Sequence, residues 1–229
     1  MPITFSDFQS AVAERIQDAA GKLAFASIDG CIREALVGRY SQARPLLQIT
    51  DFTGDGHTYE WEISTDNFPG WIANFSSIAD LEYPAGDRDP SILEKDEWRI
   101  YRPSSGTANL RLVQIVPGNG QILRVRYTAP HADDGSTVPE ADFYGVVNLA
   151  SSLAAWRLHA LYNQLGDSAV GGDAVDYHSK SAEYRLLSQD LEKAFKVAFG
   201  LDKDEPQPAA SRTAEWSPNS ESGGRKLTH

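Results

Sequence analysis

Residues 139–166 read PEADFYGVVNLASSLAAWRLHALYNQLG, and this stretch decides the fold. Its apolar side chains recur every three or four residues, which is typical of a helix with one wide buried face. Pro139 near the first turn, Glu140 and Asp142 beside the N-terminal dipole, and Gly166 at the end mark its limits. The sequence therefore predicts a long helix with an apolar stripe formed by Phe143, Val146, Val147, Ala150, Leu153, Ala154, Leu158, Leu161 and Leu165.

Helical periodicity also lies on both sides of this stretch. A fourth helix is predicted to follow Asp173 and to end at Gly200, and its short link to the third favours an antiparallel helix pair. Near the N-terminus, a first helix is predicted to start at Ser6, with Gln9 completing a capping box. A second, shorter helix is predicted over residues 29–40.

The middle of the chain, residues 46–130, has the period of two that is typical of strands. The runs 47–49 and 59–63 flank the turn residues 53–56, which predicts a β-hairpin. Further short strands follow, and in the last one Arg124 and Arg126 face away from Leu123, Val125 and Tyr127. We expect a compact antiparallel sheet or a small barrel.

The predicted fold class is therefore α+β. A helical bundle core of about four helices is built from residues 1–45 and 136–200, with the β insertion at 46–130 between them. Residues 201–229 are rich in Pro and Ser, so they predict a flexible, extended tail that binds a partner. Trp216, with Arg212 near it, is the candidate docking anchor of this tail; the alternative is that Trp216 is simply a tolerated exposed residue.

Composition excludes several classes of function. The net charge of −11 argues against a sequence-independent grip on nucleic acid, although a surface that DNA only slides past can be acidic. Cys31 is the single cysteine, so no intrachain disulfide or multi-cysteine zinc site is predicted. We find no signal peptide and no apolar run long enough for a membrane span, and expect synthesis in a cytoplasm.

One stretch has the spacing of a calcium-binding loop. Residues Asp51 to Glu62 place oxygen donors at loop positions one, three, five and twelve, with glycine at position six. Both flanks have the pattern of strands, however, so a Gly-Asp-Gly hairpin turn is the favoured interpretation. The histidines are scattered, and nucleophile elbows, phosphate loops and dinucleotide fingerprints are absent. No catalytic residue, cofactor or metal is predicted.

Several phrases resemble proteins from the head–tail (neck) region of tailed bacteriophages, over about residues 35–195. They are Tyr40-Ser41-x-x-Arg44-Pro45, Asp51-Phe52-x-Gly54-Asp55-Gly56, Phe75-Ser76-Ser77-Ile78, Glu82-Tyr83-Pro84-Ala85-Gly86, residues 125–131 (VRYTAPH) and residues 148–155 (NLASSLAA). The helical core also resembles head–tail adaptors.

The resemblance implies a structural virion protein of the neck, assembled in the host cytoplasm. It implies a ring under the portal, usually twelvefold, that joins the portal protein to the next neck or tail-completion protein. Double-stranded DNA would pass without specific binding, and no membrane is involved. The tail with Trp216 and Arg212 would dock on the portal, and the inter-subunit face would include Trp61, Trp71, Trp98, Arg124 and Arg126.

Other interpretations remain open at the level of sequence. Aromatic residues at alternating strand positions are more often core residues than sugar- or base-stacking platforms. The chain could also be another phage tail or baseplate structural protein, or a carbohydrate-binding β module on a helical stalk.

Overall fold

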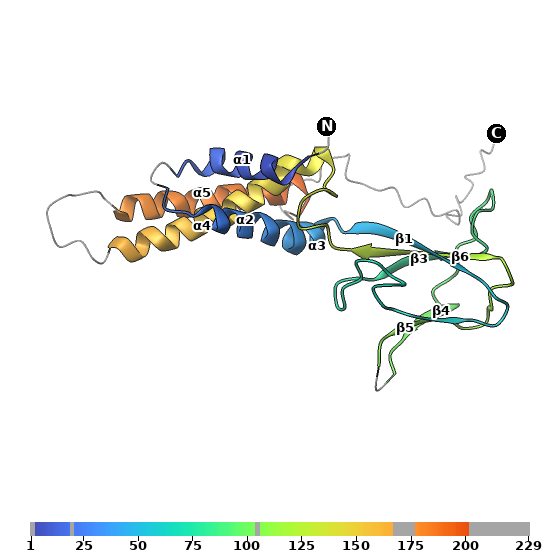
Figure 1. The fold of residues 1–229 in the computed structure, drawn as a ribbon. Helices are drawn as coiled ribbons and strands as arrows, with labels where there is room; N and C mark the ends of the chain where they lie inside the picture. The colour runs from blue at the N-terminus through green and yellow to red at the C-terminus, as the bar shows by residue number, and fades with distance from the viewer. Residues whose placement is uncertain (1–2, 19–20, 104–105, 167–176, 202–229) are drawn as a thin grey trace, which may run out of the picture.

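The computed structural model describes residues 3–18, 21–103, 106–166 and 177–201. It confirms the predicted α+β fold, with a helical bundle and a β part that lie end to end (Figure 1). The bundle contains α1 (Phe5–Ile16), α2 (Phe25–Glu34), α4 (Phe143–Gly166) and α5 (Tyr177–Ala198). All the strands lie between α2 and α4 in the chain, so the β part is an insertion into the bundle.

The helix α4 is the centre of the bundle, because α1, α2 and α5 all pack against it. The helices α4 and α5 are antiparallel, as predicted: Ser152 contacts Ser188, and Tyr162 stacks on Tyr184. The buried residues of α4 largely follow the predicted stripe. Leu161 is an exception with 37% of its surface exposed, since the helix instead turns Tyr162 inward, one turn after Leu158.

The first two helices begin earlier than predicted. Thr4 is the N-cap of α1, and both its backbone N–H and its hydroxyl donate to the Asp7 carboxylate at 2.8 Å, so the capping pair is Thr4–Asp7 and the prediction of Ser6 and Gln9 was wrong. The helix α2 begins at Phe25 and continues into the π-helical segment η1 (Ala35–Tyr40) and the short α3 (Ser41–Ala43). Gly38 leaves helical geometry inside η1 and produces the kink there.

The β part contains two three-stranded antiparallel sheets. The first has the order β1 (Leu46–Thr53), β6 (Ile122–Ala129), β3 (Ile78–Glu82). The second has the order β2 (Glu60–Glu62), β5 (Asn109–Leu112), β4 (Trp98–Tyr101). The predicted hairpin between residues 47–49 and 59–63 was wrong, because β1 pairs with β6 and β2 pairs with β5.

The reason is a long-range contact of the turn residues. The Gly54 N–H donates to the Gln121 carbonyl at 2.7 Å, and the Gly56 N–H donates to the Pro117 carbonyl at 3.0 Å. A Cβ on Gly54 would lie 2.4 Å from the Gly118 oxygen, so only glycine permits this approach. The stretch 53–56 therefore extends the β1–β6 pairing and does not fold back on itself.

Each part has its own hydrophobic core. In the bundle, residues of α1, α2, η1, α4 and α5 form one buried cluster. In the β part, both sheets contribute to a second cluster: Ile63, Phe68, Leu81, Leu93, Leu110, Leu112, Leu123, Val125 and Tyr127. The chain crosses between the parts where Ser41 lies beside His131: the Ser41 hydroxyl accepts from the His131 N–H at 2.8 Å and donates to the Leu36 carbonyl at 2.6 Å.

Candidate interaction surfaces

The outer face of the β1–β6–β3 sheet carries both arginines that were predicted to contact a neighbour. Arg124 on β6 donates through Nε and Nη2 to the two Asp51 oxygens on β1, each at 2.9 Å. The carboxylate of Glu82 on β3 lies 3.8 Å from the same guanidinium. The hydrogen bonds from Arg124 hold the pKa of Asp51 below its usual value. Arg126 likewise pairs with Asp80 at 2.5 Å.

These ion pairs run across the strands in the order β1, β6, β3. They fix the register of the sheet while the guanidinium groups stay partly exposed, so the pairs are accessible to a neighbouring subunit. Their role toward a partner stays a prediction.

The strand β1 has an unpaired edge within the described residues, since β6 is its sole neighbour in the sheet. Leu47 and Ile49 on this strand expose 62% and 58% of their surfaces, and they project on the same face as Asp51. We call β1 with these two side chains the β1 edge. The sequence analysis did not predict the exposure of this edge. A signal was present, because Ile49 is odd-numbered and Phe52 even-numbered, so a strand through both places apolar residues on each of its faces.

The three predicted tryptophans of the β part lie at the border of its core. Trp61 packs against Phe52 with ring centroids 5.3 Å apart, and Trp71 packs against Tyr127 at 5.8 Å. Trp98 is also partly buried, and its indole nitrogen is buried without a hydrogen-bond partner in the described part of the chain. All three therefore contribute to the core while part of each ring is exposed.

Trp216 and Arg212, the candidate residues of the C-terminal tail, lie outside the described residues.

Two carboxylates of the calcium-like stretch, those of Asp51 and Asp55, already have partners. Asp51 binds Arg124, as above. Asp55 accepts hydrogen bonds from the backbone N–H groups of His57 and Thr58 and from the Thr58 hydroxyl at 2.6–2.8 Å. These hydrogen bonds hold the pKa of Asp55 far below its usual value, and the bond from the Thr58 hydroxyl has the largest effect. The geometry is that of an Asx turn, although the strands on either side of it do not pair as the predicted hairpin.

The bundle exposes large apolar side chains of its own. The fractions exposed are 78% for Phe25, 66% for Tyr144, 55% for Leu186 and 53% for Trp156. Phe25 begins α2, Tyr144 and Trp156 belong to α4, and Leu186 belongs to α5. Apolar surface is thus offered by three of the helices as well as by the β1 edge.

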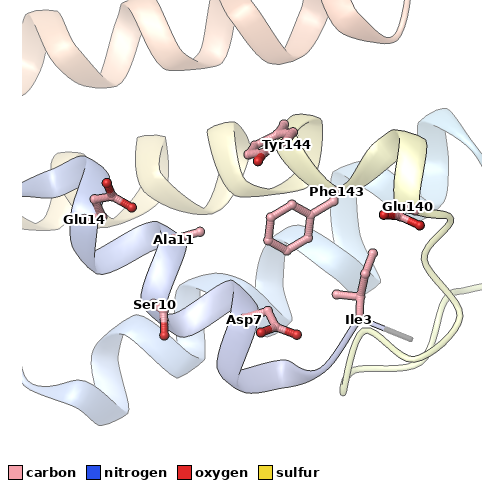
Figure 2. A pocket seen from close by; sticks show the side chains of 8 residues that line it. All are labelled: Ile3, Asp7, Ser10, Ala11, Glu14, Glu140, Phe143 and Tyr144. Carbon is pink, nitrogen blue, oxygen red and sulfur yellow. The ribbon is translucent and has the colours of Figure 1, made fainter. Parts of the chain in front are cut away.

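A shallow groove of about 510 Å³ lies between α1 and the start of α4 (Figure 2). Phe143, Tyr144, Ala11 and Ile3 supply apolar surface, and the carboxylates of Asp7, Glu14 and Glu140 stand around them. The chemistry of this groove suits an apolar segment with basic side chains.

Three further observations limit the chemistry of the described residues. No three His, Cys, Asp or Glu side chains among them gather closely enough to hold a metal ion. Cys31 is buried in the bundle, and burial raises the pKa of its thiol to about 11, so the reactive thiolate is disfavoured. None of the helices in the described ranges is both long and apolar enough to cross a membrane.

Comparison with known proteins gives matches among solved structures alone: no protein-family model matches the chain, and no curated protein matches it. The chain is similar to chains of gene transfer agent (GTA) particles. One is from the neck of an empty GTA particle computed with C6 symmetry, with a TM-score of 0.29 and 12% identity over 77% of this chain and 90% of that chain.

A second similar chain is from the neck of a native GTA particle computed with C12 symmetry, with a TM-score of 0.27 and 16% identity over 79% of this chain and 85% of that chain. A third is from the virion of a native GTA particle, with a TM-score of 0.28 and 13% identity over 80% of this chain and 89% of that chain. Because these TM-scores are low, the function proposed below rests on the residues of the chain itself.

Proposed function

We propose that this chain is a structural protein of a phage-type virion neck, an adaptor whose copies form a ring below the portal protein. The ring joins the portal to the next neck or tail-completion protein and lets double-stranded DNA pass. The predicted twelvefold order and the portal contact through Trp216 and Arg212 belong to this proposal.

The observation that carries the proposal is exposed apolar surface on both parts of an elongated subunit. A chain that functions alone seldom leaves Phe25, Tyr144 and Trp156 more than half exposed on the bundle and Leu47 and Ile49 exposed on a free sheet edge. A subunit that touches neighbours along its length needs such surface at several places.

The neck-like phrases of the sequence support the same proposal, because they fall in both parts of the fold. Residues 148–155 lie in α4, the central helix of the bundle, and residues 125–131 run from β6 to the junction at His131. The resemblance therefore covers the scaffold as a whole.

The charge of the chain suits a channel for DNA. With a net charge of −11, the copies of a ring repel a phosphate backbone more than they bind it, so DNA slides without being held.

The proposal is tested by mixing the purified chain with a portal protein from the same virus or particle and measuring mass by sedimentation velocity. We expect the chain to join the portal as a ring-sized complex. A chain that sediments unchanged beside an intact portal contradicts the proposal.

A matched pair of variants makes the test specific. Leu186→Ser removes an exposed apolar side chain from α5, and Gln189→Ser changes an exposed polar one on the same helix. We expect both variants to fold, and assembly to weaken at least tenfold for the Leu186 variant alone, since burying a leucine at an interface contributes about 1.5–3 kcal/mol. Equal assembly of both variants excludes this face of α5 from the interface.

A further inference from the structure

The β1 edge presents backbone hydrogen-bonding groups as well as apolar side chains. The Gly120 N–H donates to the Gly54 carbonyl at 2.9 Å, and the Thr128 N–H donates away from β1, to Ser77, at 2.8 Å. In an antiparallel pair of strands, every second residue of one strand exchanges hydrogen bonds with the other strand, and the residues between them direct their backbone groups to the opposite side. The even-numbered residues of β1 therefore bond to β6, and the odd-numbered ones direct their N–H and C=O groups outward: Leu47, Ile49, Asp51 and Thr53.

This edge lacks the usual protection against strand addition. Edge strands are commonly blocked by lysine, proline or a bulge, and β1, with the sequence LLQITDFT, has none of these and pairs with β6 without a register shift. Its outward backbone groups and the Leu47 and Ile49 side chains together form a template for one more strand.

The C-terminal segment has a matching pattern. Residues 209–217 read AASRTAEWS and lie between Pro208 and Pro218, so they form a proline-free stretch. In an extended conformation Arg212, Ala214 and Trp216 project on one face, and Thr213 and Glu215 on the other.

We infer that residues 212–216 of the free chain add to its own β1 edge as an antiparallel strand. Trp216 then lies opposite Leu47, Ala214 opposite Ile49, and Arg212 opposite Asp51. A parallel alignment would place Arg212 beside Leu47 and Trp216 beside Asp51, and it would lose both matches. The antiparallel alignment is the one that pairs apolar with apolar and cation with anion.

The charges of the sheet support this alignment. Asp51 is followed across the strands by Arg124 and then by Glu82, at 2.9 Å and 3.8 Å. Arg212 beside Asp51 extends this row to four charges of alternating sign. The next row of side chains across the sheet contains Ile49 and Arg126. Ala214 would join this row, and because it is small and uncharged it brings no like charge near Arg126.

The linker between α5 and residues 212–216 is long enough to bring this segment to the β1 edge. Leu201, three residues after the end of α5, lines a groove with Gln42 and Ala43, and these two lie only a few residues before β1 begins. Residues 202–211 can span roughly 33–36 Å when extended, whereas Asp51 lies only about 17 Å along β1 from Leu46. A tether this short gives the chain's own segment a high effective concentration, which favours it over the segment of a second copy.

The test is amide hydrogen exchange, residue by residue, on the full chain and two full-length variants. Ala214→Pro removes the N–H that faces Ile49, and Ala210→Pro makes the same change outside the strand. We expect the Leu47, Ile49 and Asp51 amides to exchange slowly in the wild type and in A210P, and at least about tenfold faster in A214P. The Gln48 and Thr50 amides, which face β6, stay slow in all three if the fold is kept.

The inference is overturned if the three outward amides exchange at unprotected rates in the wild type, or if A214P leaves them slow. Protection that rises with protein concentration also overturns it, because a second copy then covers the edge. These outcomes do not depend on the neck role, since they concern the free chain. In the assembled ring, release of the segment would free Trp216 and Arg212 for the portal.

Discussion

The Tyr40 hydroxyl donates a buried hydrogen bond of 2.9 Å to Oδ2 of Asp142, which joins the two ends of the β insertion. Tyr40 ends η1, and Asp142 ends η2 (Glu140–Asp142) just before α4. Arg44 also donates to Asp142, with 2.7 Å between Nη1 and Oδ1. Burial, together with the bond to Asp142, raises the pKa of Tyr40 well above its usual value. The insertion is thus clamped at its base, so the β part and the bundle keep one geometry.

Tyr40→Phe should lower the free energy of unfolding by about 1–2 kcal/mol, because it removes a buried hydrogen bond to a carboxylate oxygen whose other donor is Arg44 Nη1, at 3.0 Å. Urea denaturation measures this loss. Tyr101→Phe, at an exposed tyrosine on β4, is the matched control and should change nothing. If the Tyr40 variant is as stable as the wild type, the bond to Asp142 is not a clamp.

Stability should fall as the pH drops below about 6.5, the ordinary pKa of histidine, because burial holds the pKa of His131 lower in the folded chain. The unfolded chain then takes up a proton that the folded chain does not bind, so the free energy of unfolding decreases until the folded pKa is reached. Urea midpoints measured between pH 8 and about pH 5 follow this loss.

The surroundings of His131 explain why the neutral ring is preferred. Nε2 lies 2.9 Å from the Arg44 carbonyl and must donate to it, so neutral Nδ1 accepts from the Thr137 hydroxyl at 3.0 Å. Protonation would place a second donor against that hydroxyl. His131→Gln should flatten the pH dependence, and His57→Gln, at an exposed turn, should preserve it. An unchanged slope in the His131 variant would assign the effect to other groups.

Gly54→Ala should destabilise the β part by about 1–3 kcal/mol, because the new methyl group meets backbone oxygens that cannot move aside. The Cβ would lie 2.4 Å from the Gly118 oxygen and 2.6 Å from the Pro117 oxygen. Gly30→Ala is the control, since its Cβ meets only the flexible Arg157 side chain at 3.4 Å. Thermal unfolding of both variants checks the difference, and equal melting temperatures would refute the close approach.

Arg124→Gln should fold with little change in stability, because its pair with Asp51 is partly exposed and surface ion pairs contribute little. If Arg124 also contacts a neighbouring subunit, the variant should bind the portal complex more weakly. Arg88→Gln removes the same charge from an exposed loop and is the control for net charge. Equal assembly of the two variants would remove Arg124 from the predicted inter-subunit face.

The helices could be predicted from the sequence because their signals are local. The stripe of residues 143–158 and the flanking Pro139 and Gly166 define α4 without knowledge of any other element. The strand pairing could not be predicted in this way. The turn residues 53–56 favour a local hairpin, and nothing near them in the sequence shows that Gly54 packs against Gly118, 64 residues later.

The candidate surfaces follow the same division. Trp61, Trp71 and Trp98 were recognised by residue type, and their part in the core agrees with the simpler interpretation of alternating aromatics. The β1 edge depends on which strand pairs with which, so its exposure emerges only from the assembled sheet. The partners of Arg124 and Arg126, on β1 and β3, likewise follow from that pairing.

The most direct test of the neck role is electron cryomicroscopy of particles that contain this chain. The account predicts a ring of subunits below the portal, with the bundle and the β part as two lobes joined at Tyr40 and Asp142. Density for the chain elsewhere in the particle, or particles that lack the chain and still join head to tail and infect, would contradict it.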